Sequence, residues 1–316
     1  MRLPRLVLTL LAGAAVLVLG AGTGTASQPL YDANVQLASL GVNGKGEALL
    51  TYRRSDGRLR HVLVWGAVNA REPAQGVPQV RFKFDYAGGW GKYRKSKYWR
   101  RFKNRCAPYD GPQLALVVAA CKAPDGSYWA LQAWQRRLPN LGFDPWLPAQ
   151  SNVELHVSHW SGELPVLEAY PNWTYDGAWQ GLFGRLTYFG QPVYGFGATE
   201  RGAPKDGYGR NVYIDTFNSS YGQGWKREAG VLTHKETGTF CHSFVPQRPF
   251  AWYPSHDTRP AAPGERYRVT VSGPGVTPVL QVEVPGLSAA DRARDGDFNA
   301  IFDRVMAGDR ICVRER

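Results

Sequence analysis

Short apolar segments separated by glycine- and proline-rich turns limit the folds open to this chain more than any other feature. The 316 residues include 36 Gly and 22 Pro, and many of these separate runs of β-branched and aromatic residues. The first such runs are separated by Asn43-Gly44 and Asp56-Gly57, dipeptides that accept the positive φ angles of tight hairpin turns. Strands at such short intervals predict a mainly β protein of antiparallel sheets, in a sandwich or jelly-roll-like arrangement.

Expected strands follow one another along most of the chain. The pattern predicts a meander of three strands over 34–42, 47–54 and 59–68, a half-buried strand over 80–86, and further strands over 114–120, 128–134, 153–160, 164–170, 182–196, 211–217, 231–244 and 266–284. The 114–120 strand is so apolar that we expect neither of its faces to meet water. One short C-terminal helix is expected, because Ser288 and Asp291 form a capping box ahead of an apolar stripe that ends before Gly308.

The N-terminus has the order of a secretory signal peptide. An apolar run over 6–19 follows Arg2 and Arg5, and small residues come next. The run is shorter than the roughly 20 apolar residues that a membrane-spanning helix needs, so it favours a cleaved signal over a membrane anchor. We therefore expect residues 1–26 to be a signal peptide, and the mature protein to be secreted and extracellular without a membrane span.

A proline-rich stretch over 138–150 is the expected domain boundary. It separates an N-terminal β domain over 27–147, which contains a basic segment over 81–105, from a C-terminal β domain over 148–316. The alternative is a single domain over 27–316. The mature chain of about 290 residues is long enough for either arrangement.

Four cysteines in an exported chain predict two disulfides. They are Cys106, Cys121, Cys241 and Cys312. Of the three possible pairings we favour Cys106 with Cys121, which flank a short local segment, and Cys241 with Cys312, which ties back the C-terminus. No two cysteines have the two-to-four residue spacing of a zinc site, so we expect no metal and no cofactor.

Positive charge is concentrated in one window. Removal of residues 1–26 leaves 36 Lys or Arg against 26 Asp or Glu, a net charge of +10, and residues 81–105 hold ten basic residues and one acid, Asp85. This window therefore carries nine of the ten net charges. Its densest part, 92–105, contains no acid and is called the cationic segment below.

The cationic segment and its neighbouring tryptophan are the predicted binding site. Its predicted contact residues are Trp90, Lys92, Arg94, Lys95, Lys97, Trp99, Arg100, Arg101, Lys103 and Arg105. Helical periodicity from Ser96 places Tyr98, Trp99 and Phe102 in one stripe and spreads the charges over the remainder. The alternative to a binding role is a turn of helix whose aromatic residues dock on the core while its charges are merely solvated.

Like charges at this density repel one another, so they favour a polyanionic partner. Because export is expected, an anionic polysaccharide or other cell-envelope polymer is favoured over nucleic acid, and no nucleic-acid-binding fold signature accompanies the segment. Aromatic residues also crowd the middle of the chain, where they either contact sugar rings or fill the core. They are Trp160, Tyr170, Trp173, Tyr175, Trp179 and Tyr188.

Two alternatives to a binding protein stay open. The first is a glycoside hydrolase or polysaccharide lyase on a β scaffold, for which the sequence offers carboxylates and lyase-type side chains but no recognisable pattern, so a binding protein is favoured. The carboxylates are Glu154, Glu163, Glu168, Asp176, Asp215 and Glu228, and the lyase-type residues are Tyr188, Tyr194, His156 and Arg185. The second is an extracellular structural or protein-interaction protein.

Short motifs add little chemistry. His156 and His159 are three residues apart on an expected strand, so their side chains should point to opposite faces and should not share a metal ion. No G-x-S-x-G elbow of a serine hydrolase is present. Asn172 and Asn218 lie in N-x-S/T sequons, which matter only in a host that glycosylates its secreted proteins.

Overall fold

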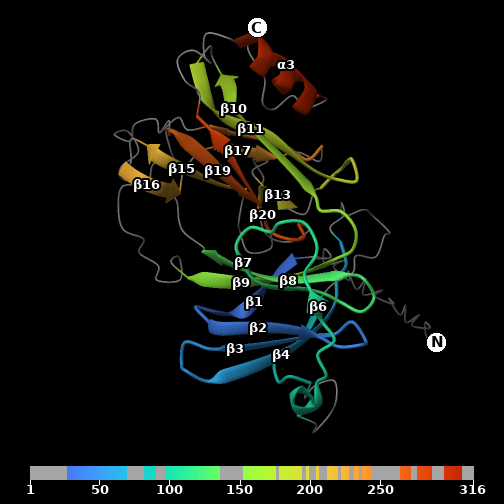
Figure 1. The fold of residues 1–316 in the computed structure, drawn as a ribbon. Coiled ribbons are helices and arrows are strands. Elements are labelled where there is room, and N and C mark those ends of the chain that lie inside the picture. The colour runs from blue at the N-terminus through green and yellow to red at the C-terminus, as the bar shows by residue number, and fades with distance from the viewer. Residues whose placement is uncertain are drawn as a thin grey trace, which may run out of the picture.

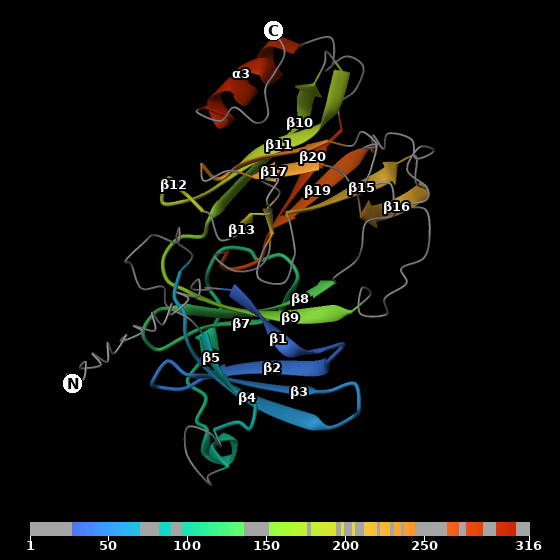
Figure 2. The same ribbon diagram turned by 180° about the vertical axis from the view of Figure 1, so that it is seen from behind.

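The computed structural model describes residues 27–69, 82–89, 97–135, 152–175, 178–193, 197–198, 204–205, 212–219, 222–227, 231–234, 237–243, 264–271, 276–286 and 295–307. Within these ranges the protein is mainly β, as expected, and every strand pair is antiparallel. The sheets are stacked along the long axis of the molecule, with a helix at one end and the N-terminal strands towards the other (Figures 1 and 2).

Two sheets form the N-terminal half. Sheet A has the order β1 (Ser27–Ala33), β9 (Val153–Trp160), β8 (Tyr128–Gln135), β7 (Val117–Lys122) and β6 (Ala107–Pro108). Sheet B has the order β2 (Gln36–Val42), β3 (Ala48–Arg53), β4 (Leu59–Gly66) and β5 (Phe82–Asp85). The order of sheet B confirms the predicted meander.

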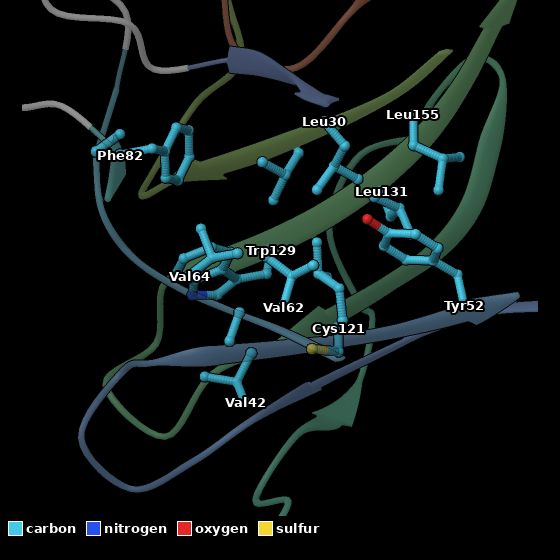
Figure 3. Close-up of a cluster of buried hydrophobic side chains, with 14 of the residues drawn as sticks. Leu30, Val42, Tyr52, Val62, Val64, Phe82, Cys121, Trp129, Leu131 and Leu155 are labelled. Carbon is cyan, nitrogen blue, oxygen red and sulfur yellow. The ribbon is translucent and has the colours of Figure 1, made fainter. Parts of the chain in front are cut away.

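The core of this half lies between sheets A and B. Leu50 of β3 and Val62 of β4 are register partners and are fully buried. Trp129 and Leu131 of β8, on the facing sheet, are also fully buried (Figure 3). Strand alternation explains this, because every second side chain of β3 enters the core while the residues between are only half-buried. Gly57, at φ +79°, forms one of the expected turns.

The C-terminal half contains two larger sheets and one short strand pair. Sheet C has the order β10 (Val166–Tyr175), β11 (Ala178–Tyr188), β18 (Thr239–Ser243) and β17 (Val231–His234), and β12 (Gln191–Pro192) also pairs with β11. Sheet D is the pair of β13 (Gly197–Ala198) and β14 (Pro204–Lys205). Sheet E has the order β16 (Gly222–Arg227), β15 (Tyr213–Ser219), β19 (Arg266–Val271) and β20 (Leu280–Pro285).

Each face of sheet C packs on a different partner. One face joins sheet E in a hydrophobic cluster that includes Leu182, Phe240 and Val269. The other face packs against helix α3 (Asp295–Val305), where Phe302 lies 4.9 Å from Phe183, measured between ring centroids. The predicted C-terminal helix is therefore present, and its predicted capping residues lie outside the described ranges.

The two halves contact each other through the outer face of sheet A. The amide of Gln132, on β8, donates to the carbonyl oxygen of Val279 and accepts from its N–H, both at 2.9 Å. Trp134, two residues further on, lies 4.4 Å from the Tyr213 ring of sheet E. The expected boundary over 138–150 lies outside the described residues, so the division into domains stays a prediction.

One strand prediction is wrong. Val117 and Val118 of β7 are 51% and 43% exposed, although we expected this strand to be fully buried. The reason is that β6 pairs only with the Cys121 end of β7, so within the described ranges the other end has a neighbour, β8, on one side alone. For Trp160, one of the aromatic residues expected either to contact sugar rings or to fill the core, the structure shows the second role, because it is fully buried on β9.

The Cys106–Cys121 disulfide is confirmed. No described cysteine is free. Cys312 lies outside the described residues, so the Cys241–Cys312 pair stays a prediction, as does the sandwich or jelly-roll arrangement. The expected signal peptide is also outside them, and among the described residues no helix is long and apolar enough to cross a membrane.

Candidate functional site

The structure describes the second half of the cationic segment, residues 97–105. All five of its basic side chains are exposed, and within the described part of the chain none of them forms an ion pair. They are Lys97, Arg100, Arg101, Lys103 and Arg105. The other predicted contact residues, Trp90, Lys92, Arg94 and Lys95, lie outside the described ranges.

The aromatic residues of this stretch turn inward, as the sequence pattern predicts. Tyr98, Trp99 and Phe102 are half-buried, and the Tyr98 and Phe102 rings meet edge to face. The helix is shorter than expected, however, because only the 3-10 turn η1 (Tyr98–Arg101) is helical and Phe102 is already extended. This turn forms the teal coil at the lower edge of Figure 1, beyond sheet B.

A stacked pair of rings fixes η1 on sheet B. The Trp99 indole lies flat on the His61 imidazole of β4, with centroids 4.0 Å apart and planes 12° apart. The backbone N–H of Trp99 donates to the Gly88 carbonyl at 3.1 Å, and His61 Nδ1 lies 2.9 Å from Thr51 Oγ1. Burial lowers the pKa of His61, so its imidazole is neutral at neutral pH. The Trp99 ring therefore stacks on an uncharged imidazole.

The end of β2 holds the rest of the segment. The Asn104 side-chain carbonyl accepts hydrogen bonds from the backbone N–H groups of Val42 and Cys106, both at 3.0 Å. Arg105 donates its backbone N–H to the Val42 carbonyl at 2.6 Å, and the Cys106–Cys121 disulfide follows immediately. The charged side chains thus extend from a backbone that is attached at both ends.

The local electrostatics follow from this attachment. Five positive charges lie within nine residues without an intervening acid, and fixed positions prevent them from separating to relieve their repulsion. The Arg100 guanidinium lies 5.1 Å from the centre of the Trp99 ring, which places one cation beside an aromatic face. Such an arrangement can bind an extended polyanion by charge and sugar rings or other flat groups by stacking.

The predicted carboxylates are committed to local partners. Arg227 donates two hydrogen bonds to the two carboxylate oxygens of Asp215, and both side chains are buried. Glu168 accepts hydrogen bonds from Arg304 at 3.3 Å and from Tyr170 Oη at 3.1 Å. A catalytic acid must be free to exchange protons with substrate, whereas both oxygens of the Asp215 carboxylate are bound by Arg227.

The remaining enzyme candidates that the structure describes are spread over several elements. Glu154 lies 3.4 Å from His156 on the outer face of sheet A, while Glu163 follows β9 and Tyr188 and Arg185 belong to sheet C. The pKa of Tyr188 is raised by burial and by the charge of Glu163, which opposes its use as a base. Asp176, Tyr194 and Glu228 lie outside the described ranges.

His156 and His159 diverge, as predicted. His159 points towards sheet B, stacks on Trp129 at 4.0 Å and places Nδ1 3.0 Å from the Gly66 carbonyl. His156 lies on the opposite face beside Trp134. Among the described residues no group of three His, Cys, Asp or Glu side chains could hold a metal ion.

Sequence reasoning missed one surface, the face of sheet E that points away from sheet C. Its side chains alternate with core residues along each strand, and arginines lie over aromatic rings across the strands. The alternation of Arg266 and Arg268 with the buried Tyr267 and Val269 was a usable signal. The cross-strand register that joins these arginines to Phe217 and Trp225 was not visible in the sequence.

Comparisons of the chain with protein-family models, with curated proteins and with solved structures found no match. The interpretation of the site therefore rests on the contacts, burial and charge of its own residues.

Proposed function

We propose that this is a secreted protein that binds an anionic glycan or another anionic cell-envelope polymer through the cationic segment. The observation that carries the proposal is the set of five exposed basic side chains, with no ion pair among the described residues, on a backbone fixed to sheet B. Their partner is absent from the described part of the chain itself. A polymer with repeated negative charges supplies that partner.

The rigid attachment supports binding in a second way. Binding costs free energy when a flexible loop must be ordered, at about 0.5–1.5 kcal/mol for each immobilised side chain and more for the backbone. Here the backbone of residues 97–106 already has fixed neighbours in Gly88, Val42 and Cys121. Only the ends of the charged side chains remain to be ordered when the polymer binds.

Arginine at two adjacent positions favours phosphate, sulfate or carboxylate groups over a diffuse counter-ion cloud. A guanidinium donates two parallel hydrogen bonds to such groups, whereas an ammonium acts as a point charge. Arg100 and Arg101 are adjacent in η1, so they can contact consecutive charged groups of a polymer. No described contact favours a catalytic function in the same way, because Asp215 and Glu168 are each bound to an arginine.

The test is salt-dependent retention on immobilised heparin, a sulfated polysaccharide. The variant Arg101→Glu/Lys103→Glu removes two cations that take no part in holding the segment on sheet B. The control Lys45→Glu/Arg58→Glu makes the same change in net charge at two exposed positions in the turns of sheet B. We expect the control to elute close to the wild type and the segment variant at clearly lower salt.

Equal elution of the two variants would contradict the proposal, because retention would then depend on net charge alone. Retention of duplex DNA but not of heparin would also contradict it in favour of nucleic acid. Circular dichroism and thermal melting of each variant show whether the fold is intact. All four positions are exposed, so we expect unchanged melting.

A further inference from the structure

The outer face of sheet E carries two rows of side chains that cross its strands. Strand register places the members of each row opposite one another, and the residues between them enter the core with sheet C. The charged row is Arg227, Asp215, Arg268 and Glu283, and the aromatic row is Trp225, Phe217 and Arg266. Charge alternates along the first row, and a cation lies beside two rings in the second.

Each arginine on this face lies over an aromatic ring. The Arg266 guanidinium carbon is 4.4 Å from the centre of the Phe217 ring, and that of Arg268 is 3.9 Å from the Trp225 ring. Contact with a ring covers one face of a guanidinium and leaves its edge, which carries the N–H donors, available for an acceptor. The face therefore places guanidinium donors beside apolar ring surface.

A carboxylate of the chain itself already uses these donors. Glu283 accepts a hydrogen bond from Arg268 at 2.8 Å and lies 3.5 Å from Arg266, so two cations share one anion. The Arg266 and Glu283 side chains are 48% and 45% exposed. An exposed ion pair contributes about 0–1 kcal/mol, so another carboxylate can replace Glu283 at little cost.

Two buried donors on the same face have no acceptor. Arg268 Nε and Arg227 Nη1 form no hydrogen bond within the described part of the chain, and the Arg227 side chain is only 8% exposed. A buried donor without an acceptor is unfavourable, and buried guanidinium groups are normally fully paired. The Arg227 guanidinium is covered by Trp134 of sheet A, 5.5 Å from the ring centre, so Arg268, whose side chain is 25% exposed, is the one of the two that a partner rich in oxygen acceptors can approach.

We propose that this face of sheet E is a second binding site, for acidic sugar units. The carboxylate of a uronate residue pairs with Arg266 and Arg268 in place of Glu283, and its ring packs beside Phe217 and Trp225. The inference rests on the proposed function, because the ligand is of the same anionic glycan class that the cationic segment would bind.

The two sites lie far apart. Sheets A and B separate sheet E from η1 in both views of the ribbon (Figures 1 and 2). A short oligosaccharide occupies one site at a time, whereas a long polymer reaching both gains avidity from the second contact.

The experiment measures binding of trigalacturonate, an acidic trisaccharide, and of maltotriose, a neutral one, by calorimetry. Two variants should act in opposite directions. Arg266→Gln removes a donor and should weaken trigalacturonate binding at least about threefold. Glu283→Gln removes the competing carboxylate and should strengthen it about twofold to fivefold.

Unchanged trigalacturonate affinity in both variants would overturn the inference, as would maltotriose binding as tight as that of trigalacturonate. The measurement is repeated in the Arg101→Glu/Lys103→Glu background, where the response to Glu283→Gln should persist. If only the difference in heparin elution between Arg101→Glu/Lys103→Glu and its control is lost, the result counts against the proposed function of the cationic segment. Loss of the opposite responses of Arg266→Gln and Glu283→Gln counts against the sheet E site.

Discussion

His242 makes the stability of the C-terminal half dependent on pH. The residue belongs to β18, between the register partners Leu182 of β11 and Leu232 of β17, and it is buried. Burial lowers its pKa from 6.5 to about 3, because the charged imidazolium loses its hydration in the core. The folded protein therefore holds His242 neutral at pH values where the unfolded chain would protonate it.

The sign of the effect follows from this difference. Stability is fully present above the unfolded pKa of 6.5 and is lost as pH falls from there towards about 3, since only the unfolded state gains a proton in that range. Each pH unit within the window costs about 1.4 kcal/mol. Between pH 6.5 and about pH 5 the loss due to this single residue should be about 2 kcal/mol.

Urea unfolding followed by tryptophan fluorescence at several pH values provides the assay. His242→Leu supplies the control, because leucine fills a similar volume in the core but has no group that titrates. The wild type should lose about 2 kcal/mol more than the variant between pH 6.5 and about pH 5, since all other titrating groups are common to both. Equal losses in the two proteins would refute the reasoning.

Three further changes test the supports of the fold. Cys106→Ser/Cys121→Ser should lower the free energy of unfolding by about 3 kcal/mol in urea titrations, because the disulfide closes a loop with a sequence separation of 15. Gly88→Ala should lower both the melting temperature and heparin retention, because φ is +65° and a Cβ would lie 2.9 Å from His61 Cβ. Gln132→Ala should cost about 2–4 kcal/mol in urea unfolding and speed limited proteolysis, since it leaves buried backbone groups without partners.

Local turn chemistry made the N-terminal meander predictable from sequence. Asp56-Gly57 lies in the turn between β3, which ends at Arg53, and β4, which begins at Leu59. The period-two pattern of Ala48, Leu50 and Tyr52 identifies the buried face. The same reasoning failed at β7 because burial depends on which strands flank it. Val117 is as apolar as a core residue, but nothing local in the sequence indicates that β6 is only two residues long.

The candidate sites differ in the same way. The cationic segment was predictable because its charge density, its aromatic residues and the following Cys106 are contiguous in the chain. The sheet E face was not, because the pairing of Phe217 with Arg266 joins residues 49 positions apart and depends on strand register. Asp215 was one of six candidate carboxylates in the sequence, and its ion pair with Arg227 depends on the register of β15 and β16, which the sequence does not show.

The salt dependence of heparin affinity shows directly whether the cationic segment binds a polyanion. Fluorescence anisotropy of labelled heparin measures the dissociation constant over a range of salt concentrations, and the slope of its logarithm against the logarithm of salt reports how many charge contacts form. If Arg101 and Lys103 contact the polymer, we expect a shallower slope and weaker binding for Arg101→Glu/Lys103→Glu than for Lys45→Glu/Arg58→Glu. Equal slopes and equal affinities for the two variants would contradict it.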